Sequence, residues 1–152
     1  MKKLNILLLM ICFTTISFGQ STTETEKSKI KELITKSFDD IWSGLNSKKI
    51  DNYYTKDFLL IENGEVWNND SIANYLDNAI LKKPIPKRVN SFEFIEVKIS
   101  KGMAWIAYKN YATFSVEDKI IGKAYWLESA TAILTENGWK LEMLHSTGVE
   151  NK

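Results

Sequence analysis

The chain has 152 residues, and its 20 Lys and Arg nearly balance its 19 Asp and Glu, which gives a formal charge of +1. This balance gives no electrostatic reason to expect nucleic acid or an anionic membrane as a partner. Hydrophobic residues form 44% of the chain and aromatic residues 12%, which indicates a packed domain and excludes a disordered one.

Residues 1–19 have the three-part pattern of a secretory signal peptide. Lys2 and Lys3 precede an apolar run that ends at Phe13, and small residues stand at Ser17 and Gly19. The run is shorter than the roughly 20 residues that a membrane-spanning helix needs, so a retained anchor is the less favoured alternative. We therefore expect an exported protein, periplasmic or extracellular, with no membrane contact after cleavage.

Cleavage after residue 19 would leave 133 residues and change the formal charge to −1, because two lysines leave with the signal. That length is typical of a single domain with one core. Cleavage would also remove Cys12, the one cysteine, and with it any disulfide, thiolate nucleophile or cysteine metal site. We expect no metal and no cofactor, and we expect residues 20–28 to form a flexible leader before a domain over 29–150.

The first part of the domain predicts helices around one small hairpin. Apolar residues at steps of three and four from Ile30 to Leu45 predict a helix, and a short helical piece follows at 50–55. The segment FLLIENGEVW predicts a hairpin that turns at Asn63-Gly64.

A third helix is predicted in NNDSIANYLDNAILKKP, after this hairpin. Asn69 or Asp70 can cap its start, and Pro84 prevents its continuation.

Everything after Lys87 predicts strand. Segments rich in β-branched and aromatic residues alternate with turns at 101–102, 117–118 and 137–138. They are RVNSFEFIEVKIS, MAWIAYKNYATFSV, IIGKAYWLESATAILT and WKLEMLHSTGV. Helices followed by a meander predict an α+β fold, with three N-terminal helices packed on one face of a curved, mostly antiparallel sheet.

The last hairpin contains His145, the one histidine. A two-residue turn at Asn137-Gly138 would place His145 opposite Ala130, with Thr147 and Glu128 on the same sheet face. That face is the more apolar one near the turn, so we expect it to point inward. His145 and Glu128 could then act as a general acid/base pair, or satisfy each other's hydrogen bonds in a mixed core.

Two alternatives remain for which side chains of the strand over 103–116 point inward. The length of the turn that follows this strand is not fixed by the sequence, and a change of one residue in it reverses the two faces. Either Tyr108 with Asn110, or Lys109 with Tyr111, points inward. Tyr108 is favoured, because apolar residues of the strand lie on its side.

Three segments in this order, IDNYYTKDFLLIENGEVW, ENGWK and LHST, resemble the nuclear transport factor 2-like superfamily. The resemblance covers residues 29–150. It is to the small exported branch usually classed as a domain of unknown function, near the polyketide-cyclase-like proteins and the association domain of calmodulin-dependent kinase.

The resemblance implies a cone-shaped fold with a pocket at its open end. His145 would point into the pocket, with Glu128 beside it and Tyr54 and Trp67 in its wall. Trp42 could line the pocket too, although its helical spacing also fits plain core.

Three functions fit these expectations. The first is a small-ligand-binding domain of unknown specificity. The second is a proton-transfer enzyme of the isomerase, cyclase or dehydratase type that uses His145 and Glu128. The third is a structural or interaction module with a filled core.

We also expect a homodimer that packs through apolar residues of the outer sheet face. These residues are Tyr125, Leu127, Ile133 and Leu144.

Overall fold

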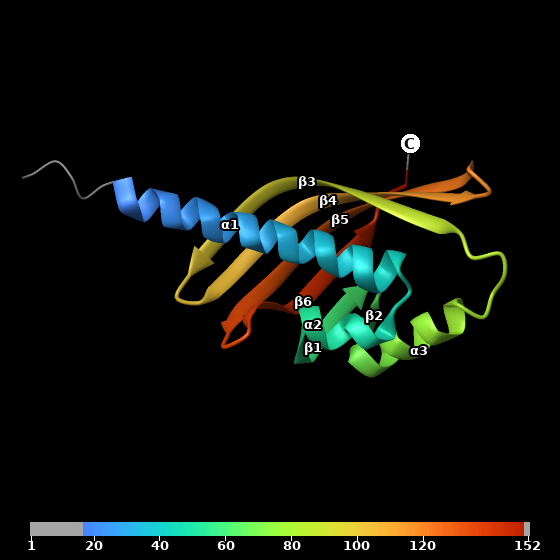
Figure 1. The fold of residues 1–152 in the computed structure, drawn as a ribbon, viewed down its shortest axis with the longest axis horizontal. Coiled ribbons are helices and arrows are strands. Elements are labelled where there is room, and N and C mark those ends of the chain that lie inside the picture. The colour runs from blue at the N-terminus through green and yellow to red at the C-terminus, as the bar shows by residue number, and fades with distance from the viewer. Residues whose placement is uncertain (1–16, 151–152) are drawn as a thin grey trace, which may run out of the picture.

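The computed structural model describes residues 17–150, in which helices cover one face of a long curved sheet (Figure 1). The predicted signal peptide lies mostly on residues 1–16, outside the described residues. The helices are α1 (Ser17–Ser37), which continues into a π-helical segment (Phe38–Ser43), a 3-10 turn (Ser47–Lys49), α2 (Ile50–Tyr53) and α3 (Asn69–Ala79). No helix among residues 17–150 is long and apolar enough to cross a bilayer.

One sheet contains all six strands, in the order β2-β1-β6-β5-β4-β3. They are β1 (Tyr54–Glu62), β2 (Glu65–Trp67), β3 (Lys87–Ser100), β4 (Met103–Val116), β5 (Lys119–Thr135) and β6 (Gly138–Gly148). Neighbouring strands are antiparallel except β1 and β6, which are parallel. The predicted α+β class, the helices and the mostly antiparallel sheet are confirmed.

The local signals explain the first half of this fold. Asn63 and Gly64 turn the β1–β2 hairpin with φ angles of 51° and 82°, as predicted. Helix α3 is capped by Asn68, whose side chain accepts a hydrogen bond from the Ser71 amide, and not by Asn69 or Asp70 as expected.

The core forms where apolar side chains of the helices meet the concave face of the sheet. Helix α1 contributes Ile30, Leu33 and Ile34, and α3 contributes Ile72 and Leu76, all at most 9% exposed. Burial of a side chain of this size stabilises the fold by about 1.5–3 kcal/mol.

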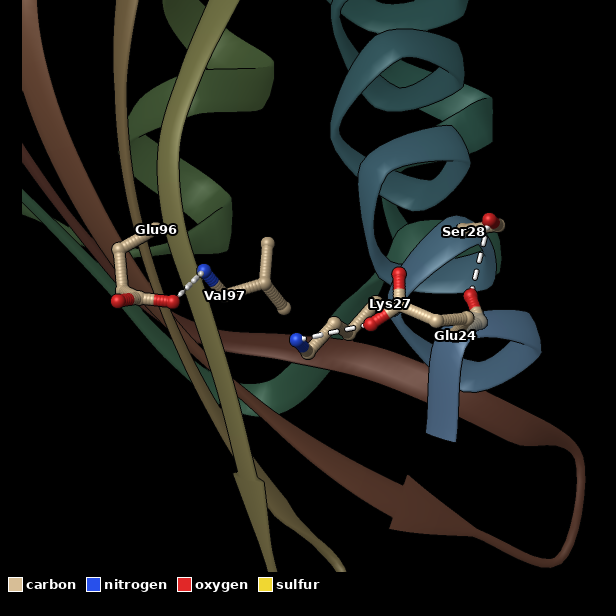
Figure 2. A network of polar contacts seen from close by, with 5 residues as sticks. All are labelled: Glu24, Lys27, Ser28, Glu96 and Val97. Carbon is tan, nitrogen blue, oxygen red and sulfur yellow. Dashed lines mark hydrogen bonds and ion pairs between the residues drawn. The ribbon is translucent and has the colours of Figure 1, made fainter. Parts of the chain in front are cut away.

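The segment expected as a flexible leader is instead helical from Ser17 onward and belongs to α1. Trp139 at the start of β6 donates a hydrogen bond of 2.8 Å from its indole Nε1 to Glu26 Oε2. Figure 2 shows Glu24 and Lys27 of α1, which form an ion pair of 3.1 Å, on the side of β3 from which Val97 projects, whereas Glu96 projects from the other side. The contacts of this segment with the sheet explain why its polar composition was misleading.

Two β-bulges decide which side chains reach the concave face. Ile95 in β3 and Glu142 in β6 have no partner in the neighbouring strand. Side chains alternate between the two faces of a strand, and each extra residue reverses this alternation. The inward positions of β3 therefore change from even to odd residue numbers, and those of β6 from odd to even.

The expected register of the last hairpin is wrong for two reasons. The two-residue turn is Glu136-Asn137 and not Asn137-Gly138, which moves the pairing by two positions and keeps the faces, and the bulge at Glu142 then moves it back by one and reverses them. Thr135 pairs with Gly138, and beyond the bulge Ala130 pairs with Leu144, not with His145. His145 lies opposite Ser129, exposed on the outer face of the sheet.

The same shift changes the predicted dimer surface. Leu127 is 47% exposed on the outer face, and Tyr125 stacks on Tyr111 there with a centroid distance of 4.7 Å. Ile133 is half-buried on the same face, but Leu144 is 2% exposed and belongs to the core. The homodimer itself stays a prediction.

The bulge at Glu142 makes adjacent residues of β6 respond differently to truncation. Leu144→Ala should lower the free energy of unfolding by about 2–5 kcal/mol, because it leaves a cavity in the core. His145→Ala, the matched control one residue along, should change it by less than about 0.5 kcal/mol. Urea unfolding of both variants measures this difference, and the opposite ranking would restore the register expected from the turn.

Candidate functional site

A buried row of polar side chains crosses the concave face of the sheet. Tyr108 in β4 pairs with Glu128 in β5, which pairs with Ser146 in β6, which in turn pairs with Glu62 in β1. Asn110 joins the row from β4. Because paired residues share a sheet face, these side chains from four strands converge on one place in the cone.

Glu128 is the centre of this cluster and is 5% exposed. Its Oε1 accepts a hydrogen bond of 3.0 Å from the Ser146 hydroxyl, and its Oε2 accepts one of 3.3 Å from Asn110 Nδ2. Both donors are buried as well, at 3% and 0% exposed. The carboxyl group is therefore held by neutral donors, without a cation in direct contact.

Burial raises the pKa of the Glu128 carboxyl to about 7, because the charged form loses its hydration. Interactions with Ser146, Tyr108 and Asn110 and the positive charge of Arg88 offset only part of this increase. A carboxyl group with such a pKa is present in both protonation states near neutral pH and can give or take a proton.

Glu62 shares the Ser146 hydroxyl with Glu128. Ser146 Oγ lies 3.4 Å from Glu62 Oε1, and a hydroxyl has one proton to donate. Burial also raises the pKa of Glu62, although its side chain is only half-buried. Glu62 therefore stands at the more open side of the cluster and Glu128 at its buried end.

Two polar atoms of the cluster have no hydrogen-bond partner among the described residues. They are the Tyr108 hydroxyl and Asn110 Oδ1, both buried. Burial and the neighbouring Glu128 charge raise the pKa of Tyr108 well above its ordinary value, so its hydroxyl stays protonated and able to donate. Buried polar groups without partners are uncommon, and a ligand can supply the missing contacts.

Aromatic side chains from the helices and β1 adjoin this cluster. The Tyr54 hydroxyl accepts a hydrogen bond of 3.0 Å from Trp42 Nε1, and the Tyr54 ring stacks on Phe58 with a centroid distance of 3.9 Å. Burial raises the pKa of Tyr54, with a further contribution from the charge of Glu128. Tyr54 and Trp42 thus form a paired wall beside the carboxyl group.

Arg88 enters the cone from the start of β3. Its guanidinium carbon lies 5.2 Å from the ring centroid of Trp126, 5.7 Å from Phe38 and 5.8 Å from Phe114. Its Nε donates to Asn90 Oδ1 at 3.0 Å. Burial lowers the pKa of the Arg88 guanidinium, and the charges of Glu128 and Glu62 offset part of this decrease, so the guanidinium remains charged.

The structure brings some of the predicted site residues together and separates others. Glu128, Tyr108 and Tyr54 lie inside the cone, and Tyr108 with Asn110 is the inward pair, as favoured. Trp42 is half-buried beside Tyr54.

His145 and Thr147 lie exposed on the outer face, so neither can pair with Glu128 as expected. The displacement by one residue at the bulge is the physical reason, because it puts Ser146 in the place assigned to His145.

Trp67 joins the aromatic wall indirectly, because the Tyr75 ring against which it packs lies 6.2 Å from the Trp42 ring. It donates its indole hydrogen to Glu65 in its own strand and packs edge-on against Tyr75. These residues line a separate surface hollow of about 490 Å³, formed by Glu65, Val66, Trp67, Ser71 and Tyr75. A second hollow of about 580 Å³ is lined by Asp51, Tyr54, Lys56, Asn68, Asn69, Asp70 and Lys140.

Sequence reasoning missed Arg88, Ser146 and Glu62. The alternation of Arg88, Asn90, Phe92 and Phe94 places the arginine on the same strand face as two phenylalanines, a signal that could have identified it. Ser146 could not be found, because nothing in the sequence marks the bulge at Glu142.

Within residues 17–150, no three His, Cys, Asp or Glu side chains form a group that could hold a metal ion. The cluster and its neighbour Arg88 offer two carboxyl groups, hydroxyl and amide donors, and one guanidinium.

Comparison with known proteins supports the fold. The structure resembles an NTF2-like protein with a cystatin-like fold from Novosphingobium aromaticivorans, with a TM-score of 0.72, 12% identity and 94% of each chain covered. It also resembles a domain of unknown function with a cystatin-like fold from Nostoc punctiforme, with a TM-score of 0.65, 14% identity and 84% of this chain and 79% of that chain covered.

A third similar structure is a ketosteroid isomerase-like protein from Erwinia carotovora atroseptica. Its TM-score is 0.58 at 14% identity, and 90% of this chain and all of the other are covered. No family model and no curated protein sequence matches the chain. At these identities the likeness establishes the fold: the chain has the NTF2-like, cystatin-like cone that its sequence motifs resemble.

The raised pKa of Glu128 predicts a specific pH dependence of stability. Below about pH 4 both folded and unfolded chains hold this proton, whereas between about pH 5 and pH 7 mainly the folded chain holds it, so wild-type stability decreases as the pH rises from about 4.5 to 7.5. Glu128→Gln removes this contribution. Its stability relative to wild type should therefore increase by about 3 kcal/mol from pH 4.5 to pH 7.5.

Urea unfolding of both proteins across this pH range measures the difference. Glu136→Gln, at an exposed turn residue, is the control and should give a difference that does not vary with pH. A constant difference for Glu128→Gln would mean that this carboxyl group titrates at its ordinary pH.

Proposed function

We propose that this chain is a small-ligand-binding domain whose ligand lies against the Glu128 cluster in the cone. One observation carries the proposal: a buried carboxyl group stands beside Asn110 Oδ1, which has no partner within the described residues, and beside the Tyr108 hydroxyl, which interacts with this carboxyl group without reaching hydrogen-bond geometry. A filled structural core would be expected to satisfy such groups internally, because each one left unpaired costs about 1–3 kcal/mol.

The surroundings of the cluster support a ligand of mixed polarity. The Tyr54, Trp42 and Trp126 rings offer apolar surface, while Tyr108 can donate and Asn110 can accept a hydrogen bond. Small-molecule sites commonly combine apolar walls with a few polar groups that fix the orientation of the ligand.

The tryptophans provide reporters for this proposal. In full-length protein labelled with ¹⁵N, members of a small-molecule library that bind should shift the indole signals of Trp42 and Trp126. The Trp105 signal should stay unchanged, because this side chain is 44% exposed on the outer face. Glu128→Gln should weaken binding of these compounds at least about five-fold, because one hydrogen-bonding carboxyl group is lost, whereas Glu136→Gln should not.

Compounds that shift only Trp105 or Trp67, or a library that shifts no indole signal, would contradict the proposal.

A second candidate function is proton transfer, and the pKa of about 7 at Glu128 favours it. In this function Glu128 would remove a proton next to a carbonyl group, and Tyr108 would donate a hydrogen bond to the carbonyl oxygen. His145 has no part in it, because its side chain lies on the opposite face of the sheet.

Carbonyl compounds that pass the indole test can be incubated with the protein in D₂O to examine this candidate. Exchange of the carbon-bound hydrogen should be catalysed and should slow by about 10²–10⁴-fold in Glu128→Gln. Binding without exchange would leave the binding function alone.

A further inference from the structure

Arg88 is the one cation among the described residues that is placed among rings inside the cone, and its surroundings are unusual for a structural arginine. Three aromatic rings lie within 5.8 Å of its guanidinium carbon. Contact with the faces of rings stabilises the guanidinium charge through the ring electrons but supplies no hydrogen-bond acceptor. The N–H groups at the edge of the guanidinium therefore remain able to donate hydrogen bonds.

The hydrogen-bond partners of Arg88 are fewer than its donors. A guanidinium has five N–H donors, and among the described residues Arg88 uses Nε toward Asn90. Asn90 is itself fixed by a bond of 2.9 Å from its Nδ2 to Ser43 Oγ. The hydrogen bonds through Asn90 and Ser43 orient the guanidinium. Its two terminal nitrogens have no hydrogen-bond partner among the described residues.

No carboxylate of the described residues lies within 4.0 Å of Arg88 to form an ion pair, since the recorded ion pairs involve lysines only. Glu128 and Glu62 influence Arg88 electrostatically from a greater distance. Arg88 is half-buried as a residue, and burial lowers the pKa of its guanidinium, so the terminal nitrogens are only partly hydrated.

We propose that Arg88 is the receptor for the carboxylate group of a monoanionic apolar ligand, which binds edge-on to the guanidinium with its apolar part among the rings. This rests on the proposed ligand-binding function and names its ligand class. The planar fork of arginine fits the two oxygens of a carboxylate. Glu62 carries a carboxyl group on the same side of the sheet, and its charge disfavours a dianion such as phosphate.

A matched pair of probes tests the charge directly in the wild-type protein. The probes are 4-phenylbutyrate and its uncharged amide, 4-phenylbutyramide, titrated into the full chain and followed through the Trp126 and Trp42 indole signals. The carboxylate should bind at least ten-fold more tightly than the amide. Equal affinities would overturn the inference without any variant, and so would inorganic phosphate displacing the carboxylate more effectively than acetate does.

Two variants locate the receptor. Arg88→Gln should remove the preference for the carboxylate and leave binding of the amide within about two-fold, and Arg88→Lys should keep only part of the preference because lysine lacks the fork. Lys87→Gln removes a neighbouring exposed charge and should leave the preference unchanged. A preference that survives in Arg88→Gln would overturn the inference.

The outcomes separate this inference from the proposed function. Neutral compounds that shift Trp126 and Trp42, combined with no preference for the carboxylate, would refute the anion receptor and leave the binding function standing. No shift of either signal by any library compound or by either probe would refute both.

Discussion

The site depends on the alternation of side chains between the two faces of a β-strand, and two unpaired residues reverse this alternation. Ile95 and Glu142 each shift their strand by one position, so that side chains on both sides of the bulge can face the concave surface. Without the shift in β6, the pairing near the turn would continue and place His145 opposite Glu128, on the inner face. With it, a serine of modest size and neutral charge fills this place, and the histidine contacts water.

The burial of Glu128 then determines the chemistry of the cone. Taking a carboxylate out of water is costly unless cations or several donors compensate it, and here the donors are two neutral side chains. The group responds by holding its proton to higher pH. Arg88 is close enough to influence this balance but too far away to cancel it, so the cone keeps an acid at one end and a cation at the other.

Most of the fold could be predicted from the sequence, because its signals are local. The helical spacing after Ile30, the turn at Asn63-Gly64 and the alternation after Lys87 each define an element without knowledge of the rest. The inward orientation of Tyr108 followed in the same way from its apolar neighbours.

The site was predicted less well, because it depends on how strands pair. A bulge leaves no clear mark in one sequence, so the turn at 137–138 alone could not give the partner of Glu128. The helical state of residues 23–28 was missed for a related reason. Their polar composition resembles a leader, and the contact that involves Glu26 comes from Trp139, far along the chain.

The position of β6 has a consequence for how the molecule is assembled. This strand is the last in chain order but lies inside the sheet, between β1 and β5. Until it is in place, the β1–β2 hairpin and the meander of β3, β4 and β5 have no hydrogen-bonded connection, and contacts between such distant segments form slowly because a long loop must close. In a chain still in synthesis, β1 and β5 therefore lack the strand that lies between them in the finished sheet. The strand that joins them also brings Ser146, so the polar cluster is assembled only when the sheet is.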